Sequence, residues 1–168
     1  GQLKQIPINI IEVSFQEALP IQLSPRLTKK MSPREHVKMF TEHNQAVFSR
    51  TAFRDFATGW IISRQDFLQK KFNQTQQFFT PQAGPDTTAC CSLRPAGLYL
   101  RIHFLGTYYE HIQSIHQKIM DYLSRNQMEI IGDIYDLPLK NHWQTNDTRT
   151  YINQLSLQVR YRSEKNDS

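Results

Sequence analysis

The sequence predicts an α+β fold in which two similar halves, each a strand, a helix and further strands, form one antiparallel sheet. Three observations favour this fold. Residues 98–104 alternate strictly between apolar and other side chains, as is typical of a half-buried strand. A helical pattern follows Gly106, with apolar residues three and four positions apart. The same order of strand, helix and strands occurs earlier in the chain, so we expect the helices to share one face of the sheet.

Length and composition are those of a single globular domain. The chain has 168 residues, of which 39% are hydrophobic and 21% are charged, and this balance excludes a disordered chain. We expect one domain over 1–162, with halves at about 6–92 and 93–162, and a disordered tail at 163–168. No apolar run approaches the roughly 20 residues of a membrane span, so we expect no membrane partner.

The charged and metal-binding residue types exclude several classes of function. The net charge of +5 comes from scattered lysines and arginines, which argues against direct binding of nucleic acid by this chain. The six histidines lack cysteine or carboxylate partners at metal-ligand spacing, so we expect no metal and no cofactor. Cys90 and Cys91 are neighbours that would point to opposite faces of a strand, and two free thiols indicate a cytoplasmic protein.

The first half begins with residues 7–23, whose pattern predicts a long strand or a bent strand pair broken near Pro20. Residues 32–35 read Ser-Pro-Arg-Glu, a capping box that should begin a helix ending near Ser49. The apolar stripe predicted for this helix consists of Val37, Phe40, Val47 and Phe48.

Three further strands complete the first half in this interpretation. Residues 56–63 form a strand in which Gly59 indicates a bulge or a close backbone approach. Ser63 can cap a short helical turn over 63–72. Residues 75–80 and 87–93 are predicted strands separated by a Gly-Pro turn, and we expect them to pair as a hairpin.

The second half has the clearer pattern. After the strand at 98–104, the helix should bury a stripe made of Ile112, Ile115, Ile119 and Leu123. Asn126 can end this helix in a left-handed conformation. Residues 128–136 and 151–160 are predicted strands, and the second of them places three aliphatic residues on one side: Leu155, Leu157 and Val159.

Alternation along the strands of the second half also predicts which side chains face away from the helices. This open face would combine tyrosines, amides, one acid and isolated aliphatics, namely Tyr99, Arg101, His103, Ile131, Asp133, Tyr135, Ile152, Gln154, Ser156 and Gln158. Such a mixture suits a pocket for a flat organic molecule, because apolar area gives affinity and a few polar groups orient the ligand. The alternative is an ordinary sheet face exposed to water.

Particular segments of the chain resemble the GyrI-like effector-binding domain. The similarity lies in PAGLYLRIHFLGTYYEHIQSIHQKIMDYL, in EIIGDIYDL, in the closing INQLSLQV and, more loosely, in GWIISRQDF. This domain forms the C-terminal half of multidrug-responsive MerR-type activators and of some AraC-type regulators. The resemblance implies two strand–helix–strand–strand halves with a ligand pocket on the face opposite the helices.

The resemblance also implies six ligand-binding residues. Tyr99, Tyr108, Asp133 and Tyr135 match the Ala-Gly-x-Tyr, Gly-x-Tyr and acid-x-Tyr elements, and Trp60 comes from the GWIIS segment. Gln154 stands where the family usually has a glutamate in the closing strand. An amide can hydrogen-bond but brings no charge, which puts in doubt both a cationic ligand bound through that position and hydrolysis depending on it.

The function implied by the resemblance is sensing of a lipophilic aromatic or cationic small-molecule effector, without enzymatic activity. The signal would pass to a DNA-binding domain, and the full-length regulator would be a homodimer. Because the first predicted strand begins within ten residues, we expect an excised effector domain, with DNA contacted only through an N-terminal domain outside this chain. The alternative is a stand-alone GyrI-like protein that acts as a hydrolase or as a protein-binding inhibitor.

Overall fold

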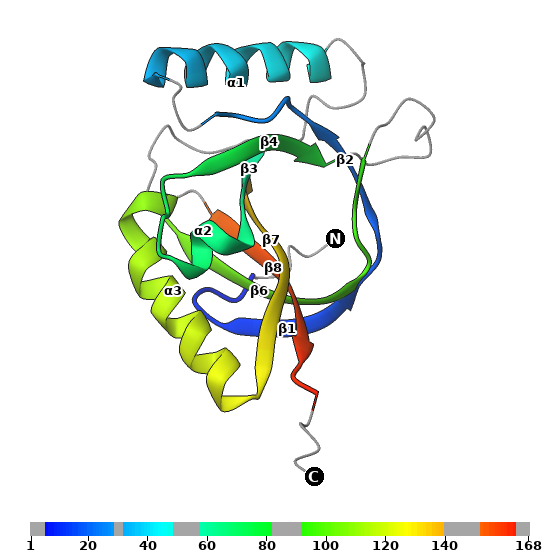
Figure 1. Cartoon of the computed structure of the whole chain (residues 1–168), viewed down its shortest axis with the longest axis vertical. Helices are drawn as coiled ribbons and strands as arrows, with labels where there is room; N and C mark the ends of the chain where they lie inside the picture. The colour runs from blue at the N-terminus through cyan, green and yellow to red at the C-terminus, as the bar shows by residue number, and fades with distance from the viewer. Residues whose placement is uncertain (1–5, 29–31, 49–57, 82–91, 140–151, 164–168) are drawn as a thin grey trace.

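A computed structural model describes residues 6–28, 32–48, 58–81, 92–139 and 152–163 (Figure 1). Within these ranges the chain forms β1 (Ile11–Gln16), β2 (Leu19–Leu23), α1 (Pro33–Phe48), β3 (Gly59–Ile62), α2 (Arg64–Leu68), β4 (Thr75–Pro81), β5 (Ser92–Arg94), β6 (Gly97–Leu105), α3 (Tyr108–Arg125), β7 (Met128–Leu139) and β8 (Ile152–Tyr161). None of these helices is long and apolar enough to cross a membrane.

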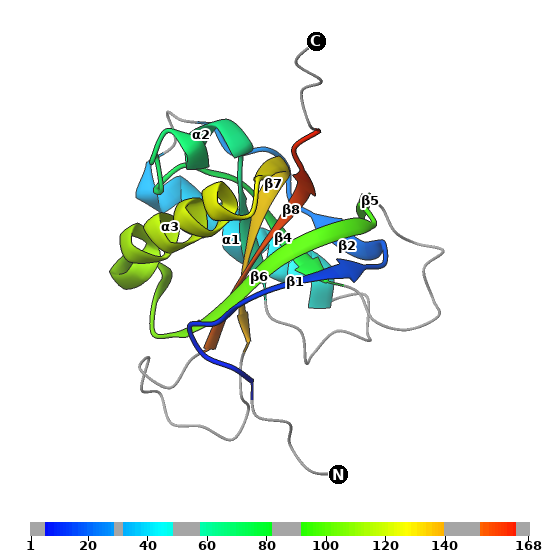
Figure 2. The same ribbon diagram turned by 90° about the horizontal axis from the view of Figure 1, so that it is seen from below.

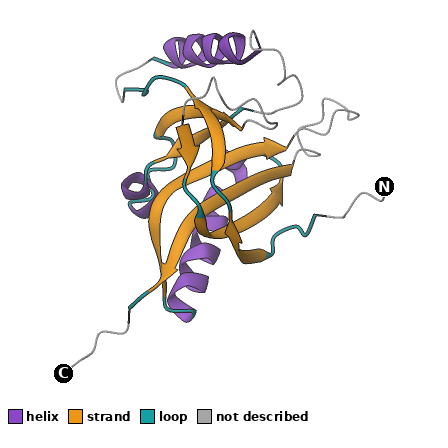
Figure 3. Ribbon diagram, turned by 90° about the vertical axis from the view of Figure 1, so that its right-hand side faces the viewer, coloured by secondary structure: helices purple, strands orange, loops and turns teal. Residues whose placement is uncertain are grey.

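The eight strands form one antiparallel sheet in the order β1-β6-β8-β7-β3-β4-β2-β5. The sheet is strongly curved, and all three helices lie outside the curve, with α1 next to β4 and with α2 and α3 on another side (Figures 1 and 3). Seen from below, β1 and β6 run side by side along one border of the sheet (Figure 2). The predicted α+β architecture, with helices on one face, is therefore confirmed.

The order of the strands shows the duplication predicted from the sequence. The second half contributes β6-β8-β7 with α3 after its first strand, and the first half contributes β2-β4-β3 with α1 after its first strand. The two sets meet where β3 pairs with β7, with Ile61 opposite Tyr135. Each half on its own would leave a sheet edge unpaired, so this central pairing closes both edges at once.

Two hydrophobic clusters occupy the two faces of the sheet. The larger lies between the sheet and α2 and α3, and it contains the predicted stripe of α3 together with Leu155, Leu157 and Val159. The smaller lies on the concave face and consists of Ile21, Ile61 and Phe79, with Tyr135 and Leu137 packed against it. The concave face is therefore partly apolar rather than a uniformly polar surface.

Four details of the sequence prediction are wrong. The first strand pair breaks after Gln16 rather than at Pro20, because Pro20 lies inside β2 opposite Leu93. The strand before Leu93 was expected to pair with β4, yet β5 pairs with β2, which lies between them. The left-handed residue after α3 is Gln127, with φ of 54°, whereas Asn126 has φ of −104°.

The fourth error concerns the apolar stripe of α1. Val37 is 65% exposed, and Phe40 remains 36% exposed although its ring meets that of Phe78 edge-on at 5.2 Å. Among the side chains of this helix that the structure describes, the buried one is His43, whose Nε2 lies 2.9 Å from Thr80 Oγ1. His43 lies three positions after Phe40 and four before Val47, so it fits the helical period, but its polar side chain kept it out of the predicted apolar stripe. The side chains of Val47 and Phe48, together with Cys90 and Cys91, lie outside the described part of the chain.

The predicted cap at Ser63 is confirmed, and its removal should have a measurable effect. Ser63 has an extended backbone, and its side chain accepts a hydrogen bond from the amide of Asp66 at 3.1 Å. We expect Ser63→Ala to lower the free energy of unfolding by about 1 kcal/mol, because one amide at the start of α2 loses its partner. Urea unfolding of the variant against the native sequence measures this loss, and Ser114→Ala in the exposed middle of α3 is the matched control. An equal effect of both substitutions would contradict a specific capping role.

Candidate functional site

A cavity of about 360 Å³ opens on the concave face of the sheet. It lies between β6, β7 and β8, and its lining consists of Pro95, Tyr99, Ile131, Gly132, Asp133, Tyr135 and Gln158. Three of the six residues that the family resemblance predicts for the ligand site, Tyr99, Asp133 and Tyr135, thus share one cavity. Its size and its mixture of aromatic, aliphatic and polar groups suit a small organic molecule.

Strand register places the two tyrosines on the same face. Tyr99 lies opposite Gln158, and Tyr135 lies opposite Ser156, so both rings project from strands that flank β8. Tyr99 is 1% exposed, and its hydroxyl donates a hydrogen bond to the carbonyl of Pro95 at 2.7 Å. The Tyr135 ring meets the Phe79 ring edge-on at 5.3 Å, which joins the cavity to the apolar cluster of this face.

Both phenols are neutral at physiological pH, and burial raises their pKa values further from it. Burial raises the pKa of Tyr135 to about 12, with further contributions from Tyr99 and Asp133. Burial also raises the pKa of Tyr99, although the neighbouring Arg94 guanidinium opposes this rise. The two rings therefore offer a ligand apolar area and hydroxyl groups that can donate hydrogen bonds, rather than negative charge.

Asp133 serves the fold as well as the cavity. Its Oδ1 accepts a hydrogen bond from the amide of Arg64, the first residue of α2, at 3.2 Å. The regular pairing of β7 with β8 is interrupted between Ile130 and Ile134, and the segment between them carries Asp133. Part of the carboxylate is thus engaged by the protein, which reduces its capacity to bind a cationic ligand.

Positive charge lies beside the tyrosines. Arg94 is 6% exposed, and its guanidinium carbon lies 4.6 Å from the centre of the Tyr99 ring. Arg101, on the same face, places Nε 3.4 Å from Ser156 Oγ. Nothing in the sequence pattern distinguishes Arg94 from other arginines, because it belongs to a strand of three residues at the edge of the sheet.

Gln154 lies on the concave face but outside the lining of the cavity. Its Nε2 is 3.0 Å from Nε2 of His103, its cross-strand neighbour. His103 is 8% exposed, and burial, followed by the nearby charge of Arg101, lowers its pKa. The neutral imidazole and the amide form a polar pair adjacent to Arg101.

Trp60 and Tyr108 lie on the opposite, helix-covered face. Their rings meet edge-on at 5.6 Å, and Tyr108 is 1% exposed with its hydroxyl donating to the carbonyl of Phe72 at 2.9 Å. The structure therefore separates these two predicted ligand residues from the other four, and it gives both a packing role between β3 and α3.

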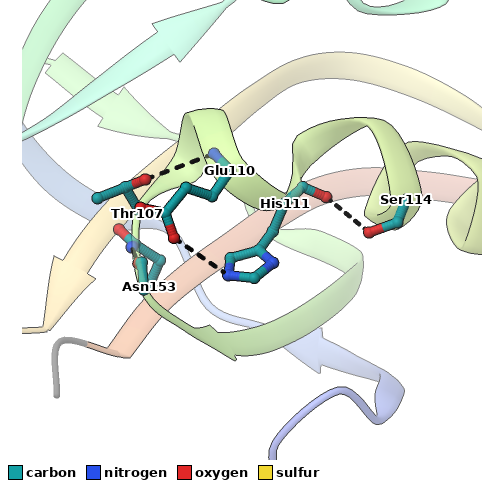
Figure 4. Close-up of polar contacts among 6 residues, drawn as sticks. Thr107, Glu110, His111, Ser114 and Asn153 are labelled. Atoms are coloured by element: carbon teal, nitrogen blue, oxygen red, sulfur yellow. Dashed lines mark hydrogen bonds and ion pairs between the residues drawn. The ribbon is translucent and has the colours of Figure 1, made fainter. Parts of the chain in front are cut away.

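The turn that positions Tyr108 is held by local polar contacts (Figure 4). Thr107 accepts from the amide of Glu110 at 3.4 Å and caps α3, while Asn153 donates to the carbonyl of Gly106. Glu110 Oε2 lies 3.7 Å from Nε2 of His111, and both side chains are largely exposed. Because Gly106 has φ of 97°, a glycine is favoured at this change from strand to helix.

An acid that the sequence reasoning missed lies one residue beyond Tyr135. Asp136 is fully buried on the helix side of β7, and neither of its carboxylate oxygens has a hydrogen-bond partner. Burial raises the pKa of this carboxyl well above its ordinary value, and its charge contributes to the raised pKa of the nearby Tyr108. The sequence did contain a signal for this buried acid. Asp136 is two positions after Ile134, so alternation places it on the apolar side of the strand.

A second cavity of about 360 Å³ lies on the helix side of the sheet, between α3 and the segment that follows α2. Its lining consists of Lys70, Phe72, Gln113, His116 and Gln117. His116 is 4% exposed and packs its ring against Phe67 and Phe72 at 4.7 and 5.1 Å. In the described ranges, no three histidine, cysteine, aspartate or glutamate side chains are grouped so as to hold a metal ion.

Comparison with known proteins identifies the fold through structure rather than sequence. No protein-family model and no curated protein sequence matches the chain. The C-terminal domain of EcmrR superposes with a TM-score of 0.60 at 11% identity, covering 90% of this chain and 98% of that domain. EcmrR in complex with DNA gives a TM-score of 0.60 at 10% identity, and the match again covers 90% of this chain but spans 57% of the EcmrR chain.

Two further structures share the architecture. SAV2435 bound to tetraphenylphosphonium has a TM-score of 0.51 at 12% identity, covering 90% of this chain and 94% of SAV2435. A hydrolase from Listeria innocua has a TM-score of 0.60 at 9% identity, covering 92% of this chain and 93% of the hydrolase. With its curved antiparallel sheet and outer helices, the chain shares the fold of the EcmrR C-terminal domain and of SAV2435, which agrees with the GyrI-like fold expected from the sequence.

Proposed function

We propose that this chain is the small-molecule effector-binding domain of a MerR-type transcriptional regulator, and that its ligand occupies the concave cavity. The observation that carries this proposal is the pair of tyrosines that flank a cavity of about 360 Å³, Tyr99, which is buried, and Tyr135, which is half-buried. An ordinary sheet face exposed to water would not bury a tyrosine to 1% exposure beside an open hollow.

The lining indicates an aromatic or amphipathic ligand. Two tyrosine rings and the side chain of Ile131 supply apolar area, and each aromatic side chain engaged would contribute roughly 1.5–3 kcal/mol of binding free energy. Asp133 and Gln158 supply polar groups that can orient the ligand. Tetraphenylphosphonium, the ligand of the similarly folded SAV2435, is an aromatic molecule of this general kind.

Signalling to DNA is part of the same proposal. EcmrR binds DNA, and this chain matches its C-terminal domain while spanning 57% of its length. We therefore propose that a DNA-binding domain accompanies this domain in a cytoplasmic, homodimeric regulator, and that occupation of the cavity changes the activity of the DNA-binding part. The six-residue ligand set predicted from the family is reduced in this proposal to Tyr99, Asp133 and Tyr135, with Gln154 nearby and Trp60 and Tyr108 in supporting positions.

Calorimetric titration with aromatic compounds of different charge tests the proposal. We expect at least one of naphthoate, naphthamide and tetraphenylphosphonium to bind with a single-site isotherm. Tyr135→Ala should weaken that binding roughly 10- to 100-fold, because the ligand loses one aromatic wall. Tyr161→Ala is the matched control, since Tyr161 is 64% exposed at the end of β8. If no compound binds, or if Tyr135→Ala has no effect, the cavity is not the effector site.

A hydrolase function is the second candidate, because the enzyme from Listeria innocua shares the fold. The residue pair favouring it in this chain is His103 and Gln154, since a histidine on the concave face could act as a general base. Its partner is an amide, however, and an amide cannot hold a protonated imidazole as a carboxylate does. Hydrolysis of a naphthyl ester that is abolished by His103→Gln would establish the enzyme and displace the sensor proposal.

A further inference from the structure

The arginine beside the cavity is buried in an unusual way. Arg94 is 6% exposed, its guanidinium covers the Tyr99 ring at 4.6 Å, and its Nε has no hydrogen-bond partner. A buried guanidinium normally has its N–H groups satisfied, because an unpaired donor loses its water without replacement. Arg94 also directly precedes Pro95, and both Pro95 and Tyr99 line the cavity. Arg94 thus lies next to the cavity wall formed by Pro95 and Tyr99, although it does not itself line the cavity.

A second cation reinforces this positive charge. Arg101 lies two residues beyond Tyr99 on the same face, and its Nε contacts a neutral hydroxyl, that of Ser156, at 3.4 Å. Burial lowers the pKa of Arg101, and repulsion from Arg94 lowers it further, so the two guanidinium groups are close enough to interact. Two like charges on a half-buried face favour the approach of an anion.

The acids of this face offset only part of this positive charge. Glu12 lies opposite Arg101 in the sheet and its charge raises the pKa of Arg101, but Glu12 is exposed on the border strand β1, and its effect is smaller than that of Arg94. The carboxylate of Asp133 accepts a hydrogen bond from the backbone amide of Arg64 rather than from either arginine side chain. The ion pairs found within the described ranges are Lys38–Glu42, Glu110–His111 and Glu129–Arg160, and none of them includes Arg94 or Arg101.

We infer that the ligand of the concave cavity is an aromatic anion, such as an aromatic carboxylate, whose acidic group is bound by Arg94 with Arg101 nearby. The ring of this ligand would contact Tyr99 and Tyr135, and its carboxylate would lie against the part of the wall formed by Pro95 and Tyr99, next to the guanidinium of Arg94. This inference rests on the proposed function, since it names the ligand class of the same cavity. It also departs from SAV2435, whose tetraphenylphosphonium is a cation.

Three compounds with the same ring system and different charge distinguish the ligand classes: naphthoate, naphthamide and naphthylmethylammonium. In calorimetric titrations of the whole chain at neutral pH we expect naphthoate to bind most tightly. Arg94→Met keeps the length of the side chain and removes its charge, and it should weaken naphthoate binding roughly 10- to 100-fold. Binding of naphthamide should change by less than about threefold, because the neutral amide gains little from the guanidinium charge.

Arg125→Met is the charge control, because Arg125 is exposed at the end of α3, on the other side of the sheet. Arg101→Met should weaken naphthoate binding in the same direction but less, and it provides a second readout if Arg94→Met does not fold. The inference is overturned if naphthylmethylammonium binds more tightly than naphthoate, or if neither arginine substitution reduces the preference for the anion. In that case, if naphthamide or naphthylmethylammonium binds and Tyr135→Ala abolishes this binding, the cavity is still the effector site but its ligand is not an anion. If none of the three compounds binds, the proposed function fails as well.

Discussion

Replacing Gly59 with alanine should lower the free energy of unfolding by about 3 kcal/mol or more, or prevent folding altogether. A β-carbon at this position would overlap the carbonyl oxygen of Asp136 and would lie 2.9 Å from Cε1 of Phe79. The first of these neighbours is backbone, which cannot move without displacing β7. The strain is therefore not relieved by rotation of a side chain.

The position of Gly59 explains why the effect should reach the whole fold. It begins β3, which pairs with β4 of its own half and with β7 of the other half. Pushing β3 away from β7 would weaken the contact through which the two halves form one sheet. Urea unfolding monitored by circular dichroism measures the loss, and a midpoint equal to that of the native sequence would show that the two strands are not held this closely.

Gly132→Ala is the matched control for this prediction. Gly132 lies in β7, and a β-carbon there would be 3.4 Å from Oε1 of Gln158, an ordinary contact with a flexible side chain. We expect this variant to unfold within about 1 kcal/mol of the native sequence, since an alanine costs little where space is available. A large effect at both glycines would point to general sensitivity of β7 rather than to the close approach at Gly59.

Strands β6 and β8 of the second half could be predicted from the sequence because their side chains alternate without conflict. Leu98–Phe104 and Leu155–Val159 bury their aliphatic residues on the helix side, as period two requires. The first half is harder to predict, because its pairing is between segments far apart in the chain. Strand β5 joins β2 across more than 60 residues, and no local pattern specifies that partner. Helix α1 buries His43, a polar residue that an apolar pattern does not select, and leaves Val37 exposed.

The candidate site shows the same division between local and long-range information. Alternation placed Tyr99 and Tyr135 on one face, and both line the cavity. Trp60 and Tyr108 came from motif resemblance, and the structure places Trp60 on the helix side, opposite to its neighbour Ile61, which belongs to the concave cluster. Arg94 lies only five positions before Tyr99, but no sequence pattern predicts that its guanidinium covers the Tyr99 ring, so its role required the three-dimensional structure.

Asp136 leads to a prediction about how stability depends on pH. Burial without a partner raises the pKa of this carboxyl, so the folded state favours the protonated form more than the unfolded state does. Protonation therefore stabilises the fold fully at pH values below the ordinary aspartate pKa of about 4. This stabilisation is lost as the pH rises through the higher pKa of the folded protein.

Asp136→Asn removes the titration while keeping the size of the side chain. Between about pH 5 and about pH 8, the native sequence should lose on the order of 1–3 kcal/mol of unfolding free energy relative to this variant, the range expected for a buried polar group without a partner. Urea unfolding of both proteins at the two pH values gives the difference directly. Other titrating groups are common to both proteins and cancel to first order.

Asp121→Asn is the control, because Asp121 is exposed on α3, where its carboxylate accepts from Gln117 Nε2 at 2.9 Å. Its stability difference from the native sequence should be nearly independent of pH over this range. A difference for Asp136→Asn that is equally flat would mean that the carboxylate finds a partner in solution. If the stability difference between Asp136→Asn and the native sequence instead changes with pH in the expected direction, burial holds the Asp136 carboxyl neutral at the junction of the two halves. A neutral carboxyl without a hydrogen-bond partner can be tolerated beside Trp60 and Tyr108.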